Sequence, residues 1–323
     1  MQIHAIRYSH TVFKENELSS ITEINSLLSD ETVLWVDVTD PDGREDLEPL
    51  EKMLDLHPLA LDDCMNIRQR PKVEDYKSHL FIVTRGIDLD LEVGRFVEGL
   101  QLGILLGKGF VITVHKTPIP LEKIRENLKS RRPPPDIGVS FLLYILLDTM
   151  VDSFETEEGS MEEHVRRVED EVLGRSKKET LTKIFNNRRN LLLLRKMMRP
   201  QRDAIRLLVE EGHPIIHPTM SLYLRDVFDH AERTLDAIDT QLGITSGSLD
   251  IYLSLVSNRM NDIIKVLTMI NTIFMPLTLI VGLYTITFPA AYPKWEYGPI
   301  LMIFIMTLMV SLIIFIFKKR KWF

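Results

Sequence analysis

The sequence predicts an α+β domain, a small β-sheet flanked by helices, followed by a very long helix and two C-terminal transmembrane helices. Strand patterns are confined to residues 1–118, and a helical spacing of apolar residues dominates afterwards. Residues 219–275 form a helical pattern of 57 residues without a proline. Residues 266–317 contain only two charged side chains, Lys294 and Glu296.

The overall composition hides this division, because 45% hydrophobic and 26% charged residues and a mean hydropathy of +0.01 are typical of soluble proteins. A formal net charge of −7 argues against a nucleic-acid-binding surface, which needs clustered Lys and Arg. Cys64 is the single cysteine, so a disulfide scaffold is excluded. Residues 1–265 carry 34 Lys/Arg and 45 Asp/Glu. This acidic balance favours an ordinary solvated surface over a role in cation handling.

The first part, residues 1–135, is predicted as a cytoplasmic α/β sheet domain. Its β-rich runs cover residues 33–38, 80–83, 100–106 and 110–114, and residues 46–56 are predicted as a short helix. Gly107-Lys108-Gly109 separates the last two runs and predicts a hairpin. The proline-rich residues 131–135 are expected to be a stiff linker.

Residues 136–216 are predicted as long cytoplasmic helices. One covers 138–173 and carries many acidic residues, which favour a solvated face over a cation-attracting one. Another covers 178–211, where Pro200 predicts a kink or a boundary. Residues 217–284 then predict a stalk helix that continues into the first membrane span. Its 57 proline-free residues correspond to roughly 85 Å.

The second span is predicted at 300–317, where 18 residues without a charge just cross a hydrocarbon core. An external loop, 285–299, and a basic tail, 318–323, flank this span. The Lys/Arg cluster of the tail and the lack of an apolar N-terminal leader place both termini in the cytoplasm. We therefore expect a multi-pass protein of the cell inner membrane, with the lipid bilayer as a partner.

A polar stripe follows one face of the first span. Its members are spaced alternately by three and four residues: Asn261, Ile264, Thr268, Asn271, Met275, Thr278 and Gly282. Such a stripe indicates either helix–helix packing or a pore wall built by several subunits. It holds no carboxylate, so a pore of this kind would pass hydrated Mg²⁺ rather than strip its waters. Ile264, Leu267 and Met275 would then form apolar constrictions.

Several segments resemble the CorA-type divalent-cation channels over nearly the whole chain. They are residues 57–63, 69–74, 224–230, 256–278 and the terminal Lys-Lys-Arg-Lys-Trp. The resemblance implies a homopentameric funnel that binds no nucleic acid and has a pore lined by Asn261, Leu267, Met275, Thr278 and Gly282. It also implies that Mg²⁺ or another divalent cation is both the transported and the regulatory ion. Asp226, in a well-matched segment, and Asp90, by position, are the implied regulatory ligands.

The chain departs from that family at its Gly-Met-Asn signature. The predicted selectivity loop here reads Tyr284, Thr285, Ile286, Thr287 and Phe288. A β-branched Thr resists the positive φ that Gly allows, and a Thr hydroxyl is shorter than an Asn amide. The sequence therefore leaves open a Mg²⁺-type channel, a member that carries Co²⁺, Ni²⁺, Zn²⁺ or an anion, and a non-conducting membrane-anchored sensor or scaffold.

An enzyme is not expected. Residues 106–109 lack the spacing of a phosphate-binding loop, and Cys64 has no identifiable catalytic partner. His213 and His217 flank Pro214, so a shared helical face for zinc is not indicated.

Overall fold

The computed structural model describes residues 1–87, 89–90, 95–96, 100–117, 119–131, 133–174, 177–291 and 297–320, without the side chains of 89–90, 95–96, 135 and 287–291. The chain divides into two compact units, Met1–Ser248 and Leu249–Phe323. The boundary lies inside one long helix, α6, which spans Ser221–Ala291.

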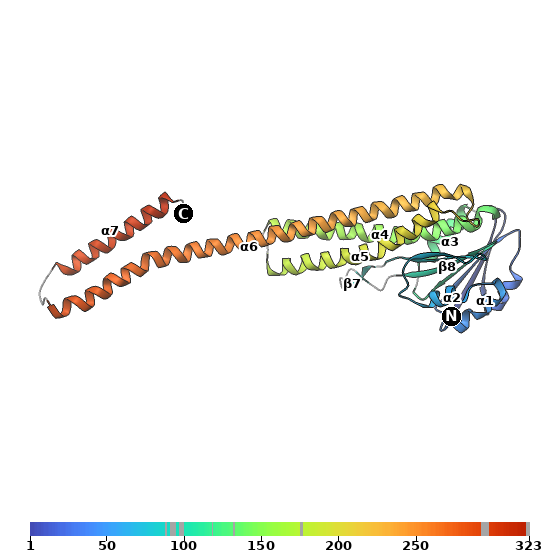
Figure 1. Ribbon diagram of the computed structural model, residues 1–323, viewed down its shortest axis with the longest axis horizontal. Coiled ribbons are helices and arrows are strands. Elements are labelled where there is room, and N and C mark those ends of the chain that lie inside the picture. Colours follow the sequence, from blue (N-terminus) through green and yellow to red (C-terminus); the bar gives the residue numbers. More distant parts are fainter. Residues whose placement is uncertain are drawn as a thin grey trace. The chain divides into compact units, whose positions relative to one another are not determined.

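The first unit is built on a seven-stranded sheet in the order β2-β1-β3-β9-β8-β5-β4. In Figure 1 this sheet lies beside α1 and α2. The central strands β3 and β9 are parallel, and the other neighbours in this sheet are antiparallel. The strands are β1 Gln2–Tyr8, β2 Phe13–Leu18, β3 Val33–Thr39, β4 Lys72–Asp75, β5 Leu80–Arg85, β8 Gln101–Gly107 and β9 Phe110–His115. Two short strands, β6 Leu89–Asp90 and β7 Arg95–Phe96, form a separate pair.

Four sequence-predicted strands are confirmed, and so is the hairpin between β8 and β9. Besides the short β6 and β7, three strands of the large sheet were not predicted, namely β1, β2 and β4. The last two are edge strands, and β2 reads Phe-Lys-Glu-Asn-Glu-Leu, with one buried residue. Edge strands carry polar residues because one side of their backbone faces solvent, so the apolar signal is weak there.

Helices cover both faces of the sheet, and the central strands are therefore apolar on both sides. Along β3, Val33 and Trp35 face one hydrophobic cluster, while Leu34 and Val36 face the other. The second cluster is closed by η1 Ile21–Ser26, η2 Arg44–Leu47, α1 Glu48–Leu54 and α2 Pro58–Met65. The first is closed by α3 Leu121–Arg131, α4 Pro135–Leu173, α5 Lys178–Glu210 and the start of α6 after η3 Pro218–Met220.

Pro135 was predicted in a linker but begins a helix, and Pro200, predicted as a kink or a boundary, marks no boundary. Pro135 lies in the first turn of α4, where its missing N–H needs no partner. Pro200 lies inside α5, which continues for ten residues to Glu210 and therefore has no boundary there. Met198 and Gln201 beside it are buried, so packing offsets the cost of the interrupted backbone bond.

The predicted continuous stalk helix is confirmed as α6, which has 71 residues. It runs to Ala291, beyond the predicted start of the loop at Thr285. The Thr285 hydroxyl donates to the carbonyl of Val281 at 2.5 Å, one turn earlier, and so supports the helical backbone there. The next helix, α7, spans Gly298–Lys319 and starts two residues before the predicted second span.

Among the described residues, three helical segments are long and apolar enough to cross a membrane: Asp136–Leu173, Pro218–Ile286 and Gly298–Lys319. In the first, 72% of the most apolar 18-residue stretch is buried within the fold, which makes it a core helix. In the other two, 0% and 6% of the corresponding stretches are buried. Apolar surface of this kind needs a cover other than water, and a bilayer supplies one.

Candidate ion pathway and metal site

The predicted pore stripe lies on α6 within the second unit, and its side chains are uncovered in the single chain. Asn261, Thr268, Asn271 and Thr278 are exposed, and Gly282 is half-buried. The three predicted apolar constriction residues are Ile264 and Met275 of the stripe and the adjacent Leu267, with exposed fractions of 53%, 77% and 56%. The described residues of this chain thus provide no partner that explains the stripe as internal packing.

Two hydroxyl groups on this side of α6 donate hydrogen bonds to backbone carbonyls of the same helix. Thr278 donates to the carbonyl of Phe274 at 2.8 Å, and Thr285 donates to the carbonyls of Val281 and Gly282. A hydroxyl that donates to the backbone offers only its lone pairs to the outside. These oxygens can accept hydrogen bonds from the water shell of a cation.

The predicted selectivity residues are part of the helix rather than of a loop. Thr285 and Ile286 are exposed, and Ile286 has an exposed fraction of 78%. Tyr284 is half-buried, and the side chains of Thr287 and Phe288 lie outside the described residues.

A second constellation lies in the first unit, between α4 and α6. Ligand atoms of Asp148, Asp152 and His230 lie within 4.8 Å of one another, and all three side chains are half-buried. Asp226 is one turn before His230, and its Oδ1 lies 3.7 Å from His230 Nε2. The predicted regulatory residue Asp226 therefore borders a group that could hold a metal ion.

The electrostatics of this cluster favour a cation. Burial raises the pKa of Asp148 to about 6, and the charges of Asp152 and Asp226 add to the rise. Lys123 of α3 donates to Asp152 at 2.8 Å and supplies one positive charge. His230 Nδ1 is buried and has no hydrogen-bond partner within the described part of the chain. Carboxylate and imidazole groups in this arrangement are ordinary ligands for divalent metals.

Three of these four residues were not predicted as ligands from the sequence. Asp148 and Asp152 were assigned to a solvated acidic face, and His230 was not singled out. The available signal was the spacing of four residues in each pair, Asp148 with Asp152 and Asp226 with His230, which places each pair on one helical face. Asp90, the other predicted ligand, pairs with Arg95 through the β6–β7 backbone, and its side chain lies outside the described residues.

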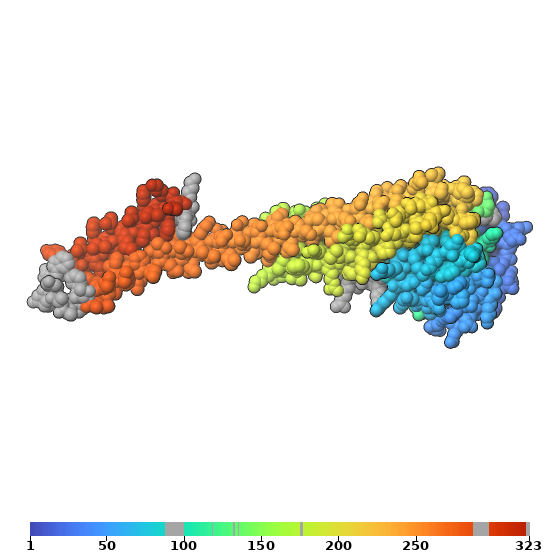
Figure 2. Space-filling view, in the orientation of Figure 1, coloured from blue at the N-terminus to red at the C-terminus, as the bar shows by residue number. Residues whose placement is uncertain are grey.

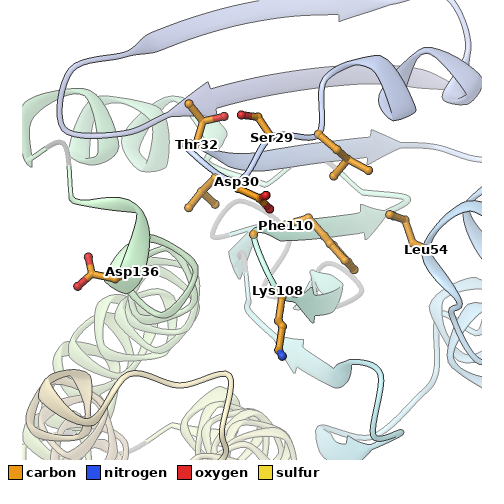
Figure 3. Close-up of a pocket in the computed structure, with 10 residues that line it drawn as sticks. Ser29, Asp30, Thr32, Leu54, Lys108, Phe110 and Asp136 are labelled. Carbon is orange, nitrogen blue, oxygen red and sulfur yellow. The ribbon is translucent and has the colours of Figure 1, made fainter.

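An open cavity of about 700 Å³ lies elsewhere in the first unit (Figure 3). It is lined by the loop before β3, the end of α1, the β8–β9 turn and the start of α4, with Asp30, Lys108 and Asp136 at its rim. Asp136 precedes Asp148 by 12 residues of α4, which corresponds to about 18 Å. The cavity is therefore separate from the cluster around Asp148.

Residues 30–319 match the model of the CorA-like Mg²⁺ transporter proteins. The chain belongs to this family. The cobalt/magnesium transport protein CorA of Thermotoga maritima is 32% identical over 99% of this chain and 92% of its own length. The putative metal ion transporter YfjQ of Bacillus subtilis is 28% identical over 100% of this chain and 98% of its own length.

The fold agrees with this family assignment. The complete structure of the CorA magnesium transporter from Methanocaldococcus jannaschii covers 99% of this chain and 98% of its own chain. It superposes with a TM-score of 0.82 at 25% identity. A CorA-like chain of this kind is a membrane protein of metal-ion transport, and the predicted family and fold class are confirmed.

Proposed function

We propose that the chain is one subunit of a homopentameric channel that conducts hydrated divalent cations, of the Mg²⁺ type, through a pore lined by α6. The observation that carries the proposal is the uncovered polar stripe, Asn261 to Gly282, with hydroxyls that offer lone pairs. Two spans per chain cannot enclose a hydrated path, so several copies must surround it. Apolar side chains at Ile264, Leu267 and Met275 then close the path by dewetting.

A flux assay tests this proposal. Purified protein in proteoliposomes, loaded with a Mg²⁺-sensitive dye, should report Mg²⁺ uptake that protein-free vesicles lack. The same vesicles should be challenged with Co²⁺, Ni²⁺, Zn²⁺ and chloride. The absence of flux for every ion would leave a membrane-anchored sensor or scaffold, the alternative from another functional class.

A second candidate, transport of another ion, is favoured by residues 285–287. Thr285-Ile286-Thr287 stands where the family resemblance implies a Gly-Met-Asn signature, and α6 continues as a helix through all three residues. No amide side chain stands at this point to bind the water shell of Mg²⁺. Restoring Gly-Met-Asn separates the readings, because Mg²⁺ conduction that appears only in the restored protein would mean that the native chain carries another ion.

Regulation by cytoplasmic divalent ions is the third part of the proposal. An ion bound by Asp226, with Asp148, Asp152 and His230 of the same chain and Asp90 of a neighbouring copy, would cancel carboxylate repulsion between subunits. Loss of the ion would allow the subunits to separate, which shifts the population toward an open channel. Support comes from the proximity of four of these groups and from the raised pKa of Asp148.

Limited proteolysis tests the regulatory site. Mg²⁺ should protect the wild-type protein from protease, and the Asp90→Asn/Asp226→Asn variant should lose much of that protection. Asp30→Asn, in the separate cavity, is the matched control and should retain it. Unchanged protection in the double variant would refute the site.

The proposed membrane placement is the cell inner membrane with both termini in the cytoplasm. Lys318 and Lys319 at the end of α7 support it, because positive residues flank spans on the cytoplasmic side. A protease added to right-side-out vesicles should leave a C-terminal tag intact, and cleavage of that tag would reverse the assigned orientation.

A further inference from the structure

One edge of α4 carries a row of carboxylates, called here the acidic stripe: Glu155, Glu162 and Glu169, seven residues apart. This spacing places them on one helical face. Glu155 and Glu162 are exposed, and none of the three makes an ion pair with any described residue. The neighbouring Glu158, which is not part of the stripe, has its pKa raised by burial and by the charges of Glu162 and Glu155. The carboxylates repel one another, and the described side chains supply no cation to them.

The exposed side of α5 carries the opposite charge. Figure 2 shows α5 as the yellow-green band beside α6. Five exposed cations on it make no ion pair within the described part of the chain, and we call them the basic stripe: Arg188, Arg189, Lys196, Arg199 and Arg206. Phe185 and Leu192 lie among them with exposed fractions of 50% and 45%. Aromatic side chains and Arg are enriched where one chain covers another, and this face carries both.

The two stripes lie on opposite flanks of α6. On the α4 flank, Gln241 of α6 donates to the carboxylate of Glu158. On the α5 flank, Arg195 and Arg202 form ion pairs with Asp239 and Glu232 of α6 at 2.8 and 2.5 Å. Since α6 stands between them, the acidic and basic stripes do not neutralise each other within one chain.

The stripes nevertheless match in height along the bundle. Glu171 of α4 contacts both Thr180 and Lys183 of α5, each at 2.7 Å, and the two helices run in opposite directions. Glu162 precedes Glu171 on α4 by as many residues as Arg189 follows Thr180 on α5, so Glu162 and Arg189 lie at the same height along the bundle. The same count places Glu155 level with Lys196.

We propose that the acidic stripe of one copy packs against the basic stripe of the next copy, as the interface between their helical layers. This inference rests on the homo-oligomer proposed above. Cyclic oligomers join two different, complementary surfaces of each subunit, and these two stripes form such a pair. Rotation about an axis parallel to α6 changes no heights, so Glu162 of one copy meets Arg189 of the next, and Glu155 meets Lys196.

Cross-linking between differently tagged chains tests the contact directly. One chain carries Glu162→Cys and the other Arg189→Cys, and the co-expressed full-length proteins are treated with a short bismaleimide. The native Cys64 is buried and contributes little background. Mixed dimers should form at least about ten times more than with Arg206→Cys, a matched control on the same stripe about 25 Å further along α5.

Charge reversal is an independent test of the same interface. Glu155→Lys/Glu162→Lys should lower the oligomeric fraction in native mass spectrometry, and adding Arg189→Glu/Lys196→Glu to the same chain should restore it. Each exposed ion pair changes an association constant by about two- to five-fold, and two pairs recur at every interface of the ring.

The outcomes separate this inference from the proposed function. A wild-type chain that stays monomeric in detergent refutes the oligomer and this interface with it. An oligomeric wild type that gives no mixed cross-link, or a quadruple variant no better than the double variant, refutes the interface alone.

Discussion

The substitution Asp148→Asn should stabilise the metal-free chain and at the same time remove its stabilisation by Mg²⁺. Burial raises the pKa of Asp148 from 3.8 to about 6, with a further contribution from Asp152. Because the folded state holds this proton more tightly than the unfolded state, stability falls as the pH rises from 3.8 to 6, and the full penalty applies above pH 6.

The size of this penalty follows from the pKa difference. Two pH units correspond to about 3 kcal/mol, and solvent screening of the half-buried carboxylate reduces this to about 1 to 1.5 kcal/mol. Asn removes the charge at nearly constant shape, so the metal-free variant should be more stable by that amount at pH 7.5. A divalent ion at about 100 times its Kd adds about 2.7 kcal/mol to the wild type, and the variant should lose most of this gain.

Denaturant unfolding of the full chain in detergent, with EDTA and with excess Mg²⁺, measures both effects. At pH 4 in EDTA the wild type and the variant should converge, because Asp148 is then protonated in the folded protein. Asp30→Asn serves as the control, since Asp30 lines the separate cavity. The reasoning is refuted if Asp148→Asn is less stable than wild type in EDTA at pH 7.5, or if it keeps the full Mg²⁺ effect.

Three further predictions concern the sheet and the pore. A Cβ at Gly103 would lie 2.6 Å from Cys64 Sγ, so Gly103→Ala should cost about 1 to 3 kcal/mol in unfolding free energy, and Cys64→Ala in the same chain should recover most of it. Burial, followed by the nearby charge of His57, lowers the pKa of His79; stability should therefore be full above its ordinary value of 6.5 and decline below it, with a shallower pH slope in His79→Gln unfolding curves. Thr278→Val removes an acceptor oxygen from the stripe and should lower cation flux in proteoliposomes severalfold, whereas Thr278→Ser, which keeps the hydroxyl, should not.

The elements with strong local signals were predictable from the sequence. The β8–β9 hairpin follows from two apolar runs around Gly107-Lys108-Gly109, where Gly109 adopts a φ of +81°. The long α6 follows from an unbroken helical pattern without proline. The end of α6 was misplaced at Tyr284, where the apolar run ends, whereas Thr285 favours continued helix through its bond to Val281.

The two candidate sites also differ in whether the sequence could predict them. The stripe from Asn261 to Gly282 lies on one helix, so its spacing was sufficient to place it on a single face. The group around Asp148 joins two helices that are far apart in the chain, and only their packing brings Asp148 and Asp152 to His230.

The sequence by itself determined which segments are apolar enough to leave water, which face of the first span is polar, and to which family the chain belongs. These properties are local, because they depend on composition and spacing within one segment. Tertiary structure decided that the apolar α4 is a core helix, that the sheet is covered on both faces, and that the acidic and basic stripes lie on opposite flanks of α6. These facts depend on long-range packing, and the pattern of a single segment does not contain them.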